Sequence, residues 1–195
     1  MKLFRARLGS VNCKRGGVLM PIQRIEIHPY YLLGKPNFDV ALIRLGYPID
    51  YSKFIRPIAI SNITEKVISA KFMTTYWPRI MYKDVALPST AKERLKFNSM
   101  RVSTQKLQDE DKCSEIIARF NVSLNEASLC MKPIVSLHSV CAPDPGAPVF
   151  AEDGLWGITS GWISPSCPNV IAPTLFTRIS SPSVRSWLDV KLLSS

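Results

Sequence analysis

Few side chains in this sequence could carry out covalent chemistry together. The chain contains two histidines, His28 and His138. A histidine acting as a base can activate a serine for acyl transfer, and Ser139 or Ser160 with His138 would be the candidates. Neither serine has an evident group that would stabilise an oxyanion, which such a reaction also needs. No metal or other cofactor is expected, because the sequence has no Cys-x-x-Cys motif and no cluster of histidines or acidic residues.

The cysteines and two glycosylation motifs point to an oxidising compartment. Five cysteines in 195 residues favour disulfides, and the odd number leaves one thiol without an internal partner. Asn62 and Asn121 each begin an N-x-[ST] sequon and are candidate glycosylation sites. Residues 1–10 carry charge but have no apolar run and no small-residue cleavage site, so this chain shows no signal peptide. A secreted-looking body without an export signal predicts a mature chain or one that lacks upstream sequence.

The composition predicts one ordinary domain or two small ones. With 46% hydrophobic and 21% charged residues the chain is not disordered, and no apolar run is long enough to span a membrane. Its 25 Lys and Arg against 15 Asp and Glu give a net charge of +10, which by itself would suit a polyanion, whether nucleic acid, a heparin-like glycan or acidic lipid. The basic residues look scattered along the sequence, with mild crowding at 83–96. A solvated surface is therefore the favoured interpretation, and nucleic acid is not an expected partner.

The elements that must position these residues are mostly short strands. Alternating or compact apolar stretches predict strands at 18–28, 40–45, 54–60, 71–76, 97–103, 145–163 and 174–179. An acidic start followed by one apolar face predicts a helix over 109–120. Ser181 as an N-cap and Pro182 at the first helical position predict a terminal helix, whose buried stripe would contain Val184, Trp187 and Leu188. Many short strands with one terminal helix indicate β-barrels or a sandwich.

Several motifs occur in an order that resembles a known family. Ile27-His-Pro-Tyr30, Asp39-Val-Ala-Leu-Ile-Arg-Leu45 and Ile55-Arg-Pro-Ile58 resemble the first half of a chymotrypsin/trypsin-like serine peptidase. Cys141-Ala-Pro-Asp-Pro-Gly-Ala-Pro148 stands where that family has Cys-x-Gly-Asp-Ser-Gly-Gly-Pro, and Trp156-Gly-Ile-Thr-Ser160 follows it. The resemblance implies an all-β fold of two antiparallel six-stranded barrels with a C-terminal α-helix at 182–193. It implies one peptidase domain over 1–195, with barrels at 1–66 and 67–181. The first barrel would be incomplete, because the family's first strands and catalytic histidine lie upstream of this chain.

The same resemblance implies that the catalytic residues have been lost. Asp39 stands at the position of the triad acid, but Pro145 stands at that of the nucleophile and has no hydroxyl. The family's oxyanion donors are N–H groups at the positions of Pro143 and Pro145, and proline has no N–H. His28 matches a non-catalytic histidine that is expected to cap a strand end. No residue remains that would act as the base.

The pocket that selects substrates in this family is predicted to be closed. Its base corresponds to Ser139, and two wall positions that are glycine in trypsin correspond to Trp162 and Thr174. Large side chains there would fill the space that a substrate side chain enters. Asp144 matches the acid that pairs with the new N-terminus of an activated enzyme, and here it would be unpaired or would have another partner.

The cysteines match two family disulfides and leave one residue over. The resemblance pairs Cys113 with Cys130 and Cys141 with Cys167. A disulfide that closes a loop of this size contributes roughly 3 kcal/mol in the chain-entropy model. Cys13 would be an unpaired thiol, or would bond to upstream sequence or to another molecule.

The residues and the resemblance together predict a non-catalytic peptidase homologue that acts in the extracellular space. Its partner would be a protein such as a protease, an inhibitor or a surface receptor, with a polyanion as a further possibility. One alternative is an incomplete or decayed chain without independent function. A third interpretation is an active hydrolase that uses Ser139 or Ser160 with His138.

Overall fold

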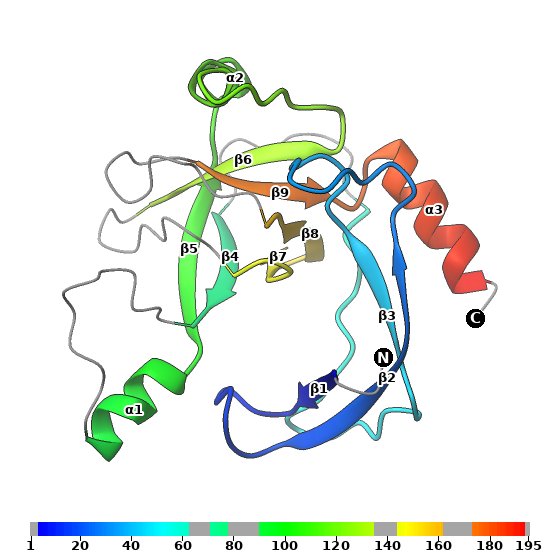
Figure 1. Cartoon of the computed structure of the whole chain (residues 1–195), viewed down its shortest axis with the longest axis vertical. Coiled ribbons are helices and arrows are strands. Elements are labelled where there is room, and N and C mark those ends of the chain that lie inside the picture. Colours follow the sequence, from blue (N-terminus) through cyan, green and yellow to red (C-terminus); the bar gives the residue numbers. More distant parts are fainter. Residues whose placement is uncertain (1–3, 63–70, 78–89, 135–143, 162–172, 194–195) are drawn as a thin grey trace. The chain divides into compact units, whose positions relative to one another are not determined.

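The computed structural model describes residues 4–62, 71–77, 90–134, 144–161 and 173–193. Figure 1 shows the elements that these residues form along the chain. In order they are β1 (Arg5–Leu8), β2 (Val18–Ile27), β3 (Ala41–Leu45), β4 (Lys71–Tyr76), α1 (Ala91–Asn98), β5 (Arg101–Leu107), α2 (Glu110–Ala118), β6 (Ser128–Pro133), β7 (Pro148–Ala151), β8 (Gly154–Thr159), β9 (Thr174–Arg178) and α3 (Pro182–Leu193). None of the helices in this part of the chain is long and apolar enough to cross a membrane.

The chain divides into two compact units, each formed by three separate segments of the sequence. Unit 1 consists of Met1–Glu26, Ala41–Pro57 and Tyr76–Val102. Unit 2 consists of Ile27–Val40, Ile58–Thr75 and Ser103–Ser195. The segment Ile27–Val40, which contains Asp39, therefore belongs to the same unit as the C-terminal half of the chain.

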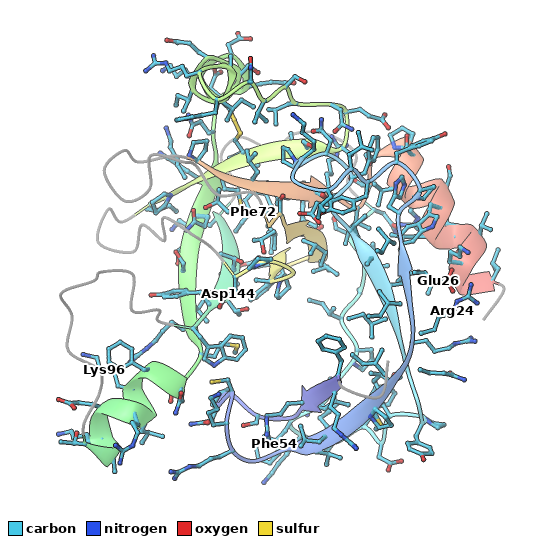
Figure 2. The ribbon with its side chains drawn as sticks, in the orientation of Figure 1. Arg24, Glu26, Phe54, Phe72, Lys96 and Asp144 are labelled. Carbon is cyan, nitrogen blue, oxygen red and sulfur yellow. A yellow bond between two sulfur atoms is a disulfide. The ribbon has the colours of Figure 1, made fainter. Side chains whose placement is uncertain are left out.

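Unit 2 contains most of a closed six-stranded barrel in the order β4-β5-β6-β9-β8-β7 (Figure 1). The pairs β5–β6, β6–β9, β9–β8 and β8–β7 are antiparallel, as is β4–β7. Seven buried side chains fill the barrel: Phe72, Leu107, Leu129, Met131, Val149, Trp156 and Phe176. The rings of Phe72 and Trp156 pack edge to face with centroids 5.0 Å apart, and Figure 2 labels Phe72 among the strands. The all-β fold with a barrel and a C-terminal helix is thus confirmed.

A second apolar cluster joins α2 to the barrel. It contains Cys113 and Ile117 from α2, Val122 beyond it, and Cys130 and Leu175 from the strands. The helix begins at Asp109, whose side chain accepts a 3.2 Å hydrogen bond from the backbone N–H of Lys112. The sequence predicted this helix from two signals, which are the acidic residues at its start and the apolar residues that follow on one face.

Unit 1 contains a three-stranded sheet in the order β1-β2-β3, together with α1. The strand β1 pairs antiparallel with β2, from Arg5 opposite Pro21 to Leu8 opposite Val18. None of the described residues of unit 1 is buried, and Val18, Ile43 and Phe54 are each more than half exposed. The buried core of the described chain therefore lies entirely in unit 2.

Two of the predicted strands differ from the structure, and two observed strands were not predicted. The strand predicted at 97–103 is wrong in its first half, because α1 occupies 91–98 and β5 starts only at Arg101. The strand predicted at 54–60 is absent, and isolated bridges Ser52–Ile55 and Ile60–Leu155 stand in its place. The sequence pattern did not reveal β6, whose first four residues are all buried, so that they show no alternation of polar and apolar positions. The short β1 was missed as well.

Candidate functional site around Asp39 and Pro145

A tight turn presents Asp39 immediately before β3. Phe38 has a positive φ of 55°, which is rare for a bulky residue, and the N–H of Val40 donates to the carbonyl of Phe38 at 2.8 Å. The ring of Phe38 stacks on the imidazole of His28, with centroids 4.9 Å apart and planes 5° apart. This stacking helps to offset the strain of the backbone turn, so the segment fixes the direction of the Asp39 side chain.

The hydrogen bonds of Asp39 connect it to the two residues that follow β8 and to the strand β9. One carboxylate oxygen, Oδ2, accepts from the hydroxyl of Ser160 at 2.8 Å and from the backbone N–H of Gly161 at 2.7 Å. The carbonyl of Asp39 accepts from the hydroxyl of Thr177 at 3.2 Å. Among the described residues, no hydrogen bond joins Asp39 to His28. The carboxylate therefore anchors the segment 27–40 to the barrel within unit 2.

Pro145 occupies the second position of a tight turn over residues 144–147. The N–H of Ala147 donates to the carbonyl of Asp144 at 3.1 Å, and Gly146 has a φ of +81°. Proline followed by a glycine with positive φ is the arrangement of a type II turn. The Pro-Gly pair in the sequence is the signal that predicts such a turn. Figure 2 labels Asp144, the first residue of this turn.

Thr159, the last residue of β8, accepts hydrogen bonds from the backbone N–H groups of this turn. The N–H of Gly146 donates to the carbonyl of Thr159 at 3.0 Å, and that of Ala147 approaches the Thr159 hydroxyl at 2.9 Å. The same hydroxyl lies 2.6 Å from the carbonyl of Asp144. Pro145 itself has no N–H. Positions 145–147 therefore offer no N–H donor to a ligand, and nothing in the sequence marks Thr159 for this role.

The Asp39 carboxylate and Pro145 flank the same glycine. A Cβ atom placed on Gly161 would lie 3.5 Å from Oδ2 of Asp39 and 3.6 Å from Cβ of Pro145. The structure thus brings together Asp39, Pro145 and Ser160, which the sequence analysis had singled out. It adds Gly161 and Thr177, which that analysis missed because they act through a backbone N–H and a hydroxyl far away in the sequence.

Several other predicted site residues lie outside the part of the chain that the structure describes. These are His138, Ser139, Cys141, Pro143, Trp162 and Cys167. The remaining pocket position, Thr174, is buried in β9. Asp144, which matches the acid that pairs with a new N-terminus, is half-buried and has interaction partners. No group of acidic, histidine and cysteine side chains that could hold a metal ion occurs within the described residues.

His28 is a core residue just after β2. Its ring is 2% exposed and contacts the rings of Phe38, Tyr30 and Trp187. Its Nδ1 lies 3.3 Å from the backbone nitrogen of Tyr30, so it accepts a hydrogen bond just past the strand end. Its Nε2 is buried and has no hydrogen-bond partner among the described residues. Burial lowers the pKa of His28, and the backbone of Ser183 opposes that shift. A buried and uncharged imidazole in an aromatic cluster is suited to packing.

The described cysteines fall into one disulfide and one free thiol. Cys113 and Cys130 are joined, with Cα atoms 6.2 Å apart, and the bond lies in the apolar cluster beside α2. Cys13 is exposed, and its Sγ lies 3.7 Å from Oδ1 of Asn98. The asparagines of both sequons are exposed as well, and the amide oxygen of Asn62 accepts a 3.2 Å hydrogen bond from Arg185.

Comparison with known proteins agrees with this architecture. The family model described as Trypsin matches residues 2–188, so the chain belongs to the trypsin family. It is 28% identical over 186 residues to a protein called trypsin from Sarcophaga bullata, covering 95% of this chain and 67% of that protein. It is 26% identical over 204 residues to transmembrane protease serine 9 of Rattus norvegicus, covering 100% of this chain and 18% of that protein.

A solved structure shares the fold at low sequence identity. The scabies mite inactivated protease paralogue S-I1 superposes with a TM-score of 0.75 at 17% identity, covering 97% of this chain and 76% of that one. At this level of identity the likeness concerns the fold alone.

Proposed function

We propose that this chain is a non-catalytic member of the trypsin family that acts by binding another protein in the extracellular space. The observation that carries the proposal is Pro145 in its type II turn. A serine peptidase needs a nucleophilic oxygen and N–H donors for the oxyanion. Positions 145–147 of this turn supply neither, because Pro145 lacks both groups and the N–H groups of Gly146 and Ala147 donate to Thr159 and Asp144.

The hydrogen bonding of Asp39 supports the same proposal. In catalysis by this family, an acid orients the histidine base. Here the hydrogen bonds that the carboxylate accepts from described residues both reach Oδ2, from Ser160 and Gly161, so they join segments of unit 2 and involve no histidine. His28 is buried in an aromatic cluster and does not approach this role.

The extracellular location rests on the disulfide and on the sequons. A disulfide such as Cys113–Cys130 persists in oxidising compartments. Asn62 and Asn121 are exposed, so both could receive glycans in the secretory pathway. The scabies mite paralogue is described as an inactivated protease, so this fold is compatible with the loss of catalysis. The binding partner would be a protease, an inhibitor or a surface receptor.

A serine-directed fluorophosphonate probe tests the proposal. The folded protein should not be labelled, whereas an active trypsin in the same assay is labelled and loses its labelling after heat denaturation. Pro145→Ser should remain unlabelled, since no histidine base is expected and Pro143 still lacks an N–H at the position of the family's other oxyanion donor. Heat-sensitive labelling of the native chain would refute the proposal and favour the interpretation with Ser139 or Ser160 as nucleophile.

A second candidate is a product with no independent function. The absence of buried side chains among the described residues of unit 1 favours it, because such a unit contributes little to stability. The two candidates differ in outcome. A binding protein retains one partner through purification under native salt, whereas a decayed product aggregates or is degraded.

A further inference from the structure

The net positive charge of the chain belongs to one of its two units. The segments of unit 1 contain fifteen Lys and Arg and four Asp and Glu, which gives a net charge of +11. Unit 2 contains ten and eleven, which gives −1. The basic residues look scattered along the sequence because the segments of the two units alternate. In the folded chain they are concentrated.

Within unit 1, a loop and a helix that are far apart in the sequence are bonded to each other. The loop 9–17 connects β1 to β2, and the N–H of its Cys13 donates to the carbonyl of Asn98 at 2.9 Å. The N–H of Met100 donates to the carbonyl of Val11 at 2.7 Å, beside an antiparallel bridge between Asn12 and Ser99. This pairing places the loop beside the C-terminal end of α1, as Figure 1 also shows.

Local hydrogen bonds fix the shape of the loop. The side-chain oxygen of Asn12 accepts from the N–H groups of Lys14 and Arg15 at 2.9 and 3.0 Å. The guanidinium of Arg7 donates to the carbonyls of Gly16 and Lys14. The charged side chains of Lys14 and Arg15 therefore project from an ordered backbone, which lowers the entropy lost when they bind a ligand.

The helix α1 and the strand after it add further cations. Lys92 and Lys96 are four residues apart and so lie on one face of α1, and Figure 2 shows Lys96 on this helix. Arg101 follows at the start of β5, and all three are exposed. We call Arg7, Lys14, Arg15, Lys92, Lys96 and Arg101 the basic surface.

Few carboxylates are available to neutralise the basic surface. Residues 4–17 contain no Asp or Glu, and Glu93 is the one acidic residue in the sequence of 90–102. Of the three acidic residues in the described part of unit 1, Glu26 pairs with Arg24 at 3.2 Å, and Glu93 accepts from the backbone of Thr90 in the capping box of α1. The third, Asp50, is exposed after β3. A concentration of cations with so few counter-charges attracts a flexible polyanion and gives binding that depends on salt.

We propose that the basic surface binds a sulfated glycosaminoglycan. The loop 9–17 contains no aromatic residue, so it offers no platform on which the bases of a nucleic acid could stack. Sulfated glycans are polyanions of the extracellular space. The choice of a glycan over other polyanions therefore rests on the extracellular location in the proposed function, whereas the charge distribution does not depend on it.

Binding to heparin tests the proposal with variants of equal charge. K14Q/R15Q and K92Q/K96Q each remove two positive charges from the basic surface, and K106Q/K112Q removes two exposed ones from unit 2. Each variant of the basic surface should weaken the binding of a heparin oligosaccharide roughly 10- to 30-fold. It should also lower the slope of log affinity against log salt by about one for each cation that no longer pairs with a sulfate. The unit 2 variant should differ from the native chain by less than about threefold.

Cys13 gives an independent readout, because it is exposed and adjacent to Lys14. Bound oligosaccharide should slow its alkylation by N-ethylmaleimide, measured by peptide mass, and should not do so in K14Q/R15Q. Equal weakening by all three double variants would overturn the proposal, since net charge alone would then explain binding. Tighter binding of an oligothymidine of matched charge would overturn the choice of glycan. Neither result bears on labelling by fluorophosphonate, so the two proposals can fail separately.

Discussion

The uneven distribution of buried side chains predicts that the two units differ in stability. Phe72 in the barrel is fully buried against Trp156, whereas Ile43 on β3 of unit 1 is 55% exposed. Phe72→Ala should cost about 3–5 kcal/mol, which lowers the melting temperature by roughly 6–20 °C for a chain of this size. Ile43→Ala should cost about 1 kcal/mol or less, because only part of its surface is withdrawn from water.

Hydrogen exchange with peptide resolution separates the units. We expect early exchange in β2 and α1, and slow exchange in β6 and β9. Residues 27–40 should exchange slowly despite their position in the first quarter of the sequence, because their backbone and Asp39 are bonded within unit 2. Phe72→Ala should accelerate exchange in residues 27–40 together with the barrel.

Two outcomes would refute this reasoning. If Ile43→Ala destabilises the chain as much as Phe72→Ala does, unit 1 has a core that the described residues do not reveal. If residues 18–26 exchange as slowly as residues 174–178, the sheet of unit 1 has other pairing, for example in a dimer. Repeating the exchange at two protein concentrations distinguishes a dimer from a stable monomer.

Three further predictions concern single interactions. Asp39→Ala should lower the free energy of unfolding by about 3 kcal/mol, since two hydrogen bonds to a carboxylate are removed, and urea unfolding measures it. An unchanged midpoint would mean that the Asp39 contacts are not formed in solution. Stability should be constant above the ordinary histidine pKa of about 6.5 and fall below it, by at most about 1.4 kcal/mol per pH unit, because burial lowers the pKa of His28 and protonation favours the unfolded chain. His28→Phe should abolish this dependence, and its persistence would assign it to another group. Non-reducing peptide mapping should find Cys113 bonded to Cys130, and reduction should cost roughly 3 kcal/mol; a bond from either cysteine to Cys13 would contradict the structure.

Elements with strong end signals or a clear apolar pattern could be predicted from the sequence. The Ser181-Pro182 pair marks the start of α3, and the β-branched run of β2 marks a strand. The helix α1 was missed because none of its residues is buried, so it has no apolar stripe. Its signal lies in the capping box, in which the side chains of Thr90 and Glu93 each accept from the other's backbone N–H.

The site could be predicted only as far as side-chain types reveal it. Asp39 and Pro145 were identified by their motifs, and the Pro-Gly pair predicts the turn. The partners of Asp39 include a backbone N–H at Gly161, which every non-proline residue has, so no residue type in the sequence identifies it. The concentration of charge in unit 1 was missed for another reason. The segments of the two units alternate along the sequence, so a count of charged residues along the chain hides the difference in their net charge.

The proposed loss of activity involves two backbone N–H groups as well as side chains, so a single substitution should not restore activity. Replacing Pro145 by serine would restore a hydroxyl and one of the two N–H donors of the family's oxyanion site, but Pro143 would still lack the N–H of the other donor. An oxyanion site and binding alone give peptidases without a triad residue roughly 10³–10⁴-fold over water. The variant would regain at most part of that residual rate, because one of the two donors would still be missing.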